Sequence, residues 1–230
     1  MKNAEKISIL IPVGAGDESW KNLLGVLEPL RTESEFIFSA VDELNLPLHW
    51  VNQSNVKFLK SQSGRALQLN GAVKISTRPI LWFLHADTSF NSNTLARLEK
   101  LIPKMGRAIY YFDLKFAGDG PKLMLINAIG VWFRSHLFKL PFGDQGFLMK
   151  RIVFDEIGPF DEAAPFGEDH LLIWEAKFNE IPIKSTGASL YTSARKYQTK
   201  GWGSTTLNHL RLTVQQAMPL GWKLIKDRFK

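Results

Sequence analysis

The segment Pro79–Thr88 reads P-I-L-W-F-L-H-A-D-T, an apolar run that ends abruptly in a short polar tail. An apolar run of this length, followed by turn-forming residues, is typical of a strand buried inside a parallel sheet. The carboxyl ends of such strands form the edge at which open α/β sheets bind ligands. Asp87 is therefore either a ligand contact at that edge or only the cap of the next helix. The segment alone leaves both interpretations open.

On both sides of this segment, β-rich apolar runs alternate with amphipathic helical runs. Further strands are expected at 7–13, 35–41, 56–59, 108–116 and 147–150, with another inside 181–192. Helices are expected at 20–30, 63–76, 93–101, 122–140, 171–178 and 204–218. Strands that alternate with helices predict an α/β fold with a mostly parallel central sheet flanked by helices.

Composition narrows the class of protein. The 230 residues are 45% hydrophobic and carry a net charge of +7, with no cysteine. The lack of cysteine excludes a disulfide scaffold, a thiol nucleophile and a Cys-based metal site. The positive charge favours an anionic partner such as nucleotide phosphates or an acidic membrane surface. No dense Lys/Arg block marks a nucleic-acid arm, so no nucleic-acid partner is expected.

No signal-peptide pattern is present, and no apolar run reaches the ~20 residues of a membrane-spanning helix. We therefore expect a cytoplasmic protein, with association at the cytoplasmic face of a membrane as an alternative. The basic, aromatic stretch at 221–230 suits a peripheral membrane contact. A solvated terminal helix is the competing interpretation.

Charged residues recur where strands or helices are expected to end or begin. They are Asp87, Asp144 in a Gly-rich turn, the Glu168-Asp169 pair at a helix start, and Arg195 in a basic cluster. Mg²⁺ and Mn²⁺ prefer oxygen ligands, usually one or two carboxylates plus substrate phosphates. A second carboxylate could take a proton from an acceptor hydroxyl, and an arginine could neutralise a leaving diphosphate. Glu168-Asp169 could equally serve only the dipole of their own helix.

Arg65 lies in the first turn of a predicted helix, where a cation is unfavourable for the helix dipole. That position indicates that Arg65 serves another purpose than its own helix, with a solvent-facing arginine as the alternative. The helix start itself is a natural site for an anion.

Rival catalytic motifs are missing from the sequence. There is no G-x-S-x-G nucleophile elbow, no G-x-x-x-x-G-K-[ST] phosphate loop and no H-E-x-x-H zinc motif. The residues therefore favour a diphosphate-plus-metal site over these alternatives.

Taken in order, the motifs resemble those of the family 2 glycosyltransferases, inverting enzymes of the GT-A fold. The matching segments are I-L-I-P-V at 9–13, G-R-A-L-Q-L-N-G-A at 64–72, L-H-A-D-T at 84–88, F-G-D-Q-G at 142–146, E-D at 168–169 and T-S-A-R-K at 192–196. The sequence is most similar to a subgroup of small stand-alone bacterial members with F-L-H-A-D-T, F-G-D-Q-G and T-S-A-R motifs. The resemblance extends over most of the chain, to about residue 200.

The resemblance implies a single glycosyltransferase-like domain over 1–230. Within it, 1–116 would be the nucleotide-binding half, 117–200 the acceptor and catalytic half, and 201–230 a C-terminal helical arm. The implied activity is metal-assisted hexosyl transfer from a nucleoside-diphosphate sugar to an acceptor hydroxyl. Neither the donor sugar nor the acceptor follows from the sequence, and a lipid-linked acceptor is one alternative.

The resemblance also implies roles for individual residues. Asp169 would be the catalytic base, with Glu168 beside it. Asp87 would contact a divalent metal (Mg²⁺ or Mn²⁺) and the donor diphosphate, with Arg195 near that diphosphate. The other implied positions are Pro12 and Val13 in the nucleotide pocket with Arg65 and Asn70 nearby, and Gly143, Asp144 and Gln145 beside the sugar and acceptor.

The sequence departs from the family pattern at three places. The first loop reads Gly14-Ala15-Gly16 where relatives often have Asn-Glu. His85 stands where many relatives have the first aspartate of a D-x-D motif, which leaves one carboxylate there. The second strand is followed by Asp42 and lacks the usual Asp-Gly-Gly-Ser run, so Asp42 is displaced from the position of a base contact.

Two other functions remain open at this point. A nucleotidyltransferase of similar α/β architecture would normally have basic residues in its first Gly-rich loop, and the loop at 14–17 has none. A non-catalytic sugar-nucleotide-binding relative would keep the fold without turnover.

Overall fold

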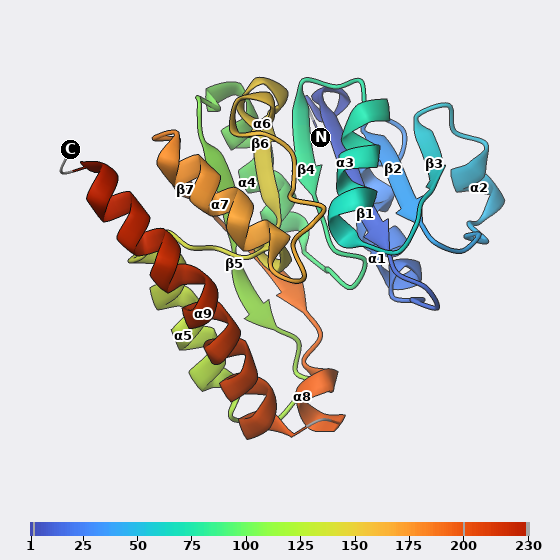
Figure 1. Cartoon of the computed structure of the whole chain (residues 1–230). Coiled ribbons are helices and arrows are strands. Elements are labelled where there is room, and N and C mark those ends of the chain that lie inside the picture. The colour runs from blue at the N-terminus through green and yellow to red at the C-terminus, as the bar shows by residue number, and fades with distance from the viewer. Residues whose placement is uncertain (2, 200, 229–230) are drawn as a thin grey trace.

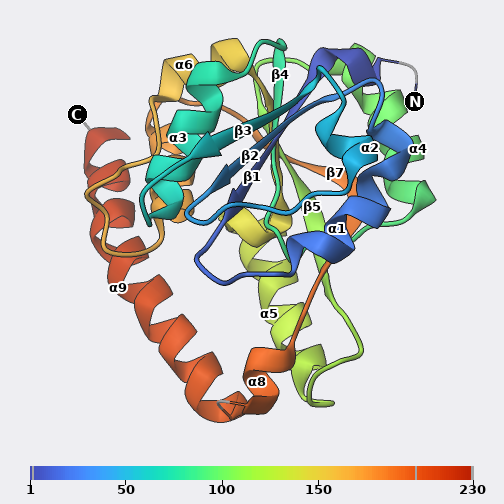
Figure 2. The ribbon, with the colours of Figure 1, turned by 90° about the vertical axis from the view of Figure 1, so that its right-hand side faces the viewer.

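The computed structural model describes residues 1, 3–199 and 201–228, which build one seven-stranded sheet flanked by helices (Figures 1 and 2). The sheet order is β3-β2-β1-β4-β6-β5-β7. Its strands are β1 (Ile7–Val13), β2 (Glu35–Ala40), β3 (Val56–Lys60), β4 (Ile80–Phe83), β5 (Ile109–Phe116), β6 (Phe147–Lys150) and β7 (Ile183–Thr192). All neighbours pair in parallel except β6, which is antiparallel to both β4 and β5. The predicted α/β class with a mostly parallel GT-A-type sheet is confirmed.

Helices cover both faces of the sheet. They are α1 (Trp20–Leu27), α2 (Leu48–Val51), α3 (Arg65–Ile75), α4 (Ser92–Leu101), α5 (Met124–His136), α6 (Arg151–Ile157), α7 (Glu168–Phe178), α8 (Arg195–Thr199) and α9 (Trp202–Arg228). Short 3₁₀ turns lie at Ala4–Lys6, Glu28–Leu30, Ile102–Lys104 and Gly143–Gln145, the last labelled η4.

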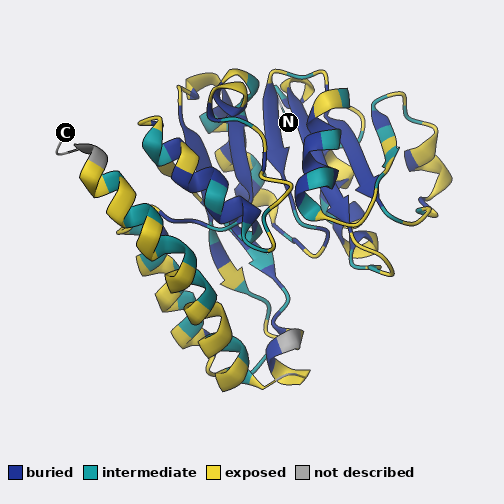
Figure 3. Ribbon diagram, viewed as in Figure 1, coloured by how far each residue is buried: buried dark blue, intermediate teal, exposed yellow. Residues whose placement is uncertain are grey.

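The central strands β1, β2 and β4 are buried on both faces, which is why they read as nearly continuous apolar runs (Figure 3). Side chains alternate between the faces, so Trp82 joins the core beneath α1, α2 and α4 while Phe83 joins the core beneath α3, α6 and α7. The sheet is thus the middle layer of three.

The antiparallel strand β6 brings two distant motifs together. Phe147, the first residue of β6, pairs with Phe83, the last residue of β4. His85 and Asp87 follow within four residues of Phe83, and η4 lies just before Phe147. Because the strands run in opposite directions, both motifs lie at the carboxyl edge of β4.

The C-terminal helix differs from the sequence prediction. Instead of ending at Met218, α9 continues through Pro219 to Arg228. A proline inside a helix removes one backbone hydrogen bond. Ala217, Leu220 and Leu224 pack against the core on both sides of Pro219, and this burial holds the helix together. Phe229 and Lys230, the end of the predicted arm, lie outside the described residues.

Glu35 is the first residue of β2, at the amino end of the strand, and it joins β2 to its neighbours. Its carboxylate accepts hydrogen bonds from Ser8 Oγ (2.5 Å), Lys57 Nζ (2.7 Å), and the amide (2.8 Å) and hydroxyl (2.9 Å) of Thr77. Burial by itself would raise the pKa of Glu35, but these hydrogen bonds together lower it to about 2. Glu35 therefore stabilises the fold in its ionised form.

Replacing Glu35 with glutamine should lower the free energy of unfolding by roughly 3 kcal/mol at neutral pH. The folded pKa lies below the ordinary value, so this stabilisation is full above pH 4.5 and is lost as the pH falls toward 2. Urea unfolding of both proteins across that range measures the difference. A difference that did not shrink with falling pH would contradict the role of the charge.

Candidate active site

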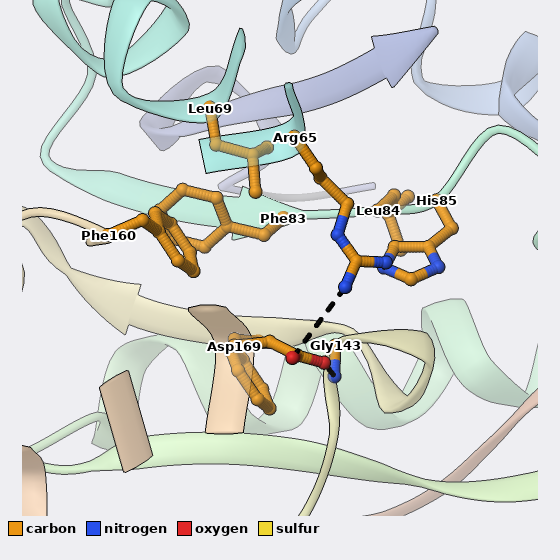
Figure 4. Close-up of a pocket in the computed structure, with 9 residues that line it drawn as sticks. Arg65, Leu69, Phe83, Leu84, His85, Gly143, Phe160 and Asp169 are labelled. Carbon is orange, nitrogen blue, oxygen red and sulfur yellow. Dashed lines mark hydrogen bonds and ion pairs between the residues drawn. The ribbon is translucent and has the colours of Figure 1, made fainter. Parts of the chain in front are cut away.

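Three polar residues and one glycine, from four separate segments, line one pocket at the carboxyl edge of the sheet (Figure 4). Arg65 comes from the first turn of α3, His85 follows β4, Gly143 opens η4, and Asp169 lies in the first turn of α7. Apolar side chains, among them Leu69, Phe83 and Phe160, form the rest of the wall. Arg65, Gly143 and Asp169 are site residues that the sequence predicted, whereas His85 was noted there only as the residue in place of a D-x-D aspartate.

Asp169 is buried at the centre of this cluster, with a side chain that is 11% exposed. Its Oδ2 accepts a 2.5 Å hydrogen bond from the Gly143 amide, and its Oδ1 accepts one of 2.9 Å from the His170 amide. Burial favours the protonated form, but the nearby Arg65 charge and the Gly143 hydrogen bond outweigh it and lower the pKa of Asp169. Asp169 is therefore a carboxylate at neutral pH.

Arg65 pairs with the acidic start of α7, an ion pair that the sequence prediction did not name. Its Nε donates to Glu168 Oε1, and its Nη2 lies 3.6 Å from Asp169 Oδ1. Nη1 is 3.1 Å from His85 Nε2. Burial lowers the pKa of Arg65, while the two carboxylate charges raise it, and the net shift is upward. The acidic start of α7 thus compensates the cation at the start of α3.

Gly143 is required by the close approach of its neighbours. A Cβ at this position would lie 2.9 Å from Asp169 Oδ2 and 3.0 Å from His85 Nε2. Any larger residue would push the amide away from the carboxylate. The first glycine of F-G-D-Q-G therefore allows the backbone to bind Asp169.

The chain is similar to S. aureus TarS. The crystal structure of S. aureus TarS 1–349 superposes with a TM-score of 0.60 at 19% identity, over 82% of this chain and 60% of that chain. The structure of TarS 1–349 in complex with UDP-GlcNAc gives a TM-score of 0.57 at 21% identity, over 82% and 58%. The complex with UDP gives 0.58 at 21%, over 82% and 60%. Neither the family models nor the curated proteins contain a match.

The chain spans about 60% of the length of TarS 1–349. At these identities the likeness establishes the shared fold.

Arg134, on α5, is a site residue that the sequence prediction missed. Its guanidinium carbon lies 3.3 Å from the centroid of the Phe142 ring, and Nη2 donates to Gln145 Oε1 at 3.1 Å. Its buried Nε has no hydrogen-bond partner within the described part of the chain. Burial lowers the pKa of Arg134, against the opposing effect of the Asp144 and Asp169 charges. The sequence feature that could have identified Arg134 is a cation inside an otherwise apolar helical run.

Asp87 lies at the same edge but outside this cluster. It is exposed, and its Oδ2 accepts a 3.0 Å hydrogen bond from Thr192 Oγ1 at the end of β7. Arg195 is also exposed, with Nε 3.7 Å from Asp119 Oδ2. Asp119 in turn accepts hydrogen bonds from Ser193 Oγ and the Ala194 amide. Asp87 thus contacts Thr192 at the start of the Thr192–Arg195 segment, and Arg195 at its end pairs with Asp119.

Asn70 and Gln145 are buried and engaged by backbone groups of the site walls. The Asn70 amide donates to the Phe160 carbonyl at 2.8 Å and accepts from the Phe160 amide at 3.0 Å. Gln145 Nε2 donates to the Phe112 carbonyl at 3.0 Å, and its Oε1 accepts from Ser135 Oγ at 2.7 Å. Both amides hold neighbouring segments in place.

The first strand supplies two further predicted residues, and the displaced Asp42 lies just beyond the second. Pro12 and Val13 are buried at the end of β1 in this TarS-like sheet, and the Val13 carbonyl accepts a 2.7 Å hydrogen bond from Gln68 Nε2. Asp42, just beyond β2, accepts a 2.9 Å hydrogen bond from the Gly16 amide. The displaced Asp42 is therefore joined to the first loop at the carboxyl edge.

The described residues contain no group of three or more His, Cys, Asp and Glu side chains that could hold a metal ion. A dedicated protein cage for a cation is thus missing from this part of the chain. The exposed carboxylate of Asp87 fits a different arrangement, in which substrate phosphates and water supply the other ligands.

Proposed function

We propose that the protein is an inverting glycosyltransferase that moves a sugar from a nucleoside-diphosphate sugar to an acceptor hydroxyl. The observation that carries this proposal is the buried, ionised Asp169, paired with Arg65 at the carboxyl edge of a GT-A-type sheet. The resemblance of the motifs to family 2 glycosyltransferases supports it. The UDP and UDP-GlcNAc complexes of TarS make a UDP-sugar the first donor to test.

In the proposed reaction, the acceptor oxygen forms a bond to the anomeric carbon while the bond from that carbon to the diphosphate oxygen breaks. Attack from the face opposite the leaving group inverts the configuration. Asp169 takes the hydroxyl proton, and the nucleoside diphosphate leaves with the electron pair. Arg65 keeps Asp169 ionised before the step, and the Gly143 amide fixes the orientation of its carboxylate.

The donor would lie along the ends of β1, β2 and β4. Pro12, Val13 and the loop that carries Gly16 and Asp42 would border the nucleotide. Asp87 would hold a divalent cation together with the phosphates, and that cation, when bound, would offset the charge of the leaving diphosphate. Arg134 and Arg195 are the side chains that we propose offset the charge of the leaving diphosphate from the protein.

Sugar and acceptor would meet near η4. Gly143 borders the pocket of Asp169, Asp144 follows it in η4, and Gln145 anchors the turn to β5 and α5. Glu168 is engaged by Arg65 Nε, so its proposed role is to position Arg65 beside the base.

UDP with Mn²⁺ or Mg²⁺ should raise the melting temperature of the protein. A ligand present at about 100 times its Kd stabilises the native state by about 2.7 kcal/mol, a shift of roughly 5–10 °C for a chain of this size. Differential scanning fluorimetry with UDP, GDP and TDP, each with and without metal, measures it. Asp87→Asn should remove the metal-dependent part, whereas Asp155→Asn on the exposed face of α6 should leave it unchanged.

No shift with any of these nucleotides would contradict the proposal. Product analysis separates it from nucleotidyl transfer, because sugar transfer releases a nucleoside diphosphate and nucleotidyl transfer releases pyrophosphate.

A further inference from the structure

The outer face of α9 carries a continuous apolar stripe. Its exposed large apolar side chains recur every three or four residues, which places them on one side of the helix. They are Leu207, Leu210, Val214, Met218, Trp222 and Ile225. The opposite side of α9 packs against the core through Ala217, Leu220 and Leu224, and Gln216 donates to the Phe166 carbonyl there. The stripe therefore faces away from the protein.

Helix α5 shows the same division. Its inner side holds the buried Met124 and Ser135, and the Ser135 carbonyl accepts a hydrogen bond from Tyr111 of β5. Its outer side and the residues just after it are apolar and about half or more exposed: Leu125, Ile126, Ile129, Trp132, Phe133, Leu137 and Phe138. We call these residues, together with the stripe on α9, the α5/α9 surface.

The two helices form one side of the molecule. Asn127 on α5 joins them, since its Oδ1 accepts from Trp202 Nε1 at 2.7 Å and its Nδ2 donates to Thr206 Oγ1 at 3.1 Å. Figures 1 and 2 show both helices extending from the sheet on the same side, and Figure 3 shows exposed residues along their length. Exposed apolar area on this scale marks an interaction site.

Positive charges predominate beside the α5/α9 surface, and Asp227 near the end of α9 is the one acidic residue of the two helices. The segments 121–140 and 201–226 contain no aspartate or glutamate. Their exposed cations are Lys122, Lys139, Arg211, Lys223 and Lys226. A second copy of the chain, docked by the same surface, would place these cations against one another. A layer of anionic lipid headgroups over apolar chains matches both the charge and the apolar stripe.

We propose that the α5/α9 surface lies on an anionic lipid bilayer. Within the described residues no helix is long and apolar enough to cross a membrane, so the contact is interfacial. Trp132 and Trp222 would lie at headgroup depth, where tryptophan is favoured. The inference goes beyond the proposed function. If that function also holds, the link from Ser135 through Gln145 to η4 places the site beside the lipid, which suits a lipid-linked acceptor.

The test is co-sedimentation of the full chain with vesicles, in the absence of any donor. We expect binding to vesicles made of phosphatidylglycerol and phosphatidylcholine, weaker binding as salt is raised, and little binding to phosphatidylcholine alone. The variant Leu210→Glu on α9 should lower partitioning by at least about tenfold, because it places a charge in the apolar contact, and Leu125→Glu on α5 should do the same. The matched control is Leu48→Glu on α2, which is 76% exposed and lies on another side of the molecule.

The proposal would be overturned if Leu48→Glu reduced vesicle binding as much as Leu210→Glu does. Absence of vesicle binding by the unmodified protein would overturn it as well. A stable dimer in light scattering that Leu210→Glu dissociates, without vesicle binding, would assign the surface to a second copy. Circular dichroism melting checks that each variant is folded. The UDP-dependent melting shift of Leu210→Glu should equal that of the unmodified protein, so the outcome is independent of the proposed sugar transfer.

Discussion

Asp169→Asn should lower the rate of sugar transfer by about 10²–10⁴-fold, the usual contribution of a general base. The substitution keeps the size of the side chain, and the asparagine oxygen can still accept the hydrogen bond from the Gly143 amide. It removes the group that takes the acceptor proton. Release of UDP from a UDP-sugar, measured in the presence of an acceptor, gives the rate. The UDP-dependent melting shift should persist, because Asp169 lies on the acceptor side of the proposed reaction.

Two control variants make this result specific. Asp155→Asn makes the same chemical change on the exposed face of α6 and should leave turnover unchanged. Glu168→Gln removes the neighbouring carboxylate and should reduce turnover less than Asp169→Asn, since Glu168 acts through Arg65. Full turnover by Asp169→Asn would refute its assignment as the base.

Arg65→Met should both destabilise the protein and shift the acidic side of its pH–rate profile. The substitution leaves Glu168 and Asp169 buried without their cation. Breaking a fully buried ion pair costs about 3–5 kcal/mol, and solvent access to Arg65 reduces our expectation to about 2–3 kcal/mol. Arg107→Met is the matched control, because Arg107 pairs with Glu156 at the surface and its loss should change the melting temperature little.

The direction of the pH effect follows from the Asp169 environment. In the unmodified protein the Arg65 charge opposes burial and holds the pKa of Asp169 below its ordinary value. Without Arg65, burial raises the pKa of Asp169, so the base becomes protonated at higher pH. The acidic limb of kcat/KM should therefore move to higher pH in Arg65→Met and stay near its original position in Arg65→Lys. An unmoved limb in Arg65→Met would show that Asp169 is not the group that titrates.

Much of the fold could be predicted from local patterns. The abrupt change from apolar to polar residues at Pro79–Thr88 marks a buried strand that ends at the ligand edge, and β4 ends there at Phe83. Strand-helix alternation predicts the sheet class, because burial on both faces demands continuous apolar runs. Arg65 in a first turn indicates a purpose other than its own helix, although the pattern does not say which.

The tertiary structure decided which helix and strand ends meet. Arg65 and Glu168 are 103 residues apart, and they pair because two helix N-termini converge on one edge of the sheet. The antiparallel insertion of β6 placed Gly143 against Asp169, and the packing of α5 placed Arg134 beside them. Burial of Leu220 and Leu224 carried α9 past Pro219. Periodicity and capping report only on neighbouring residues, whereas these contacts depend on long-range burial and charge pairing that no local pattern encodes.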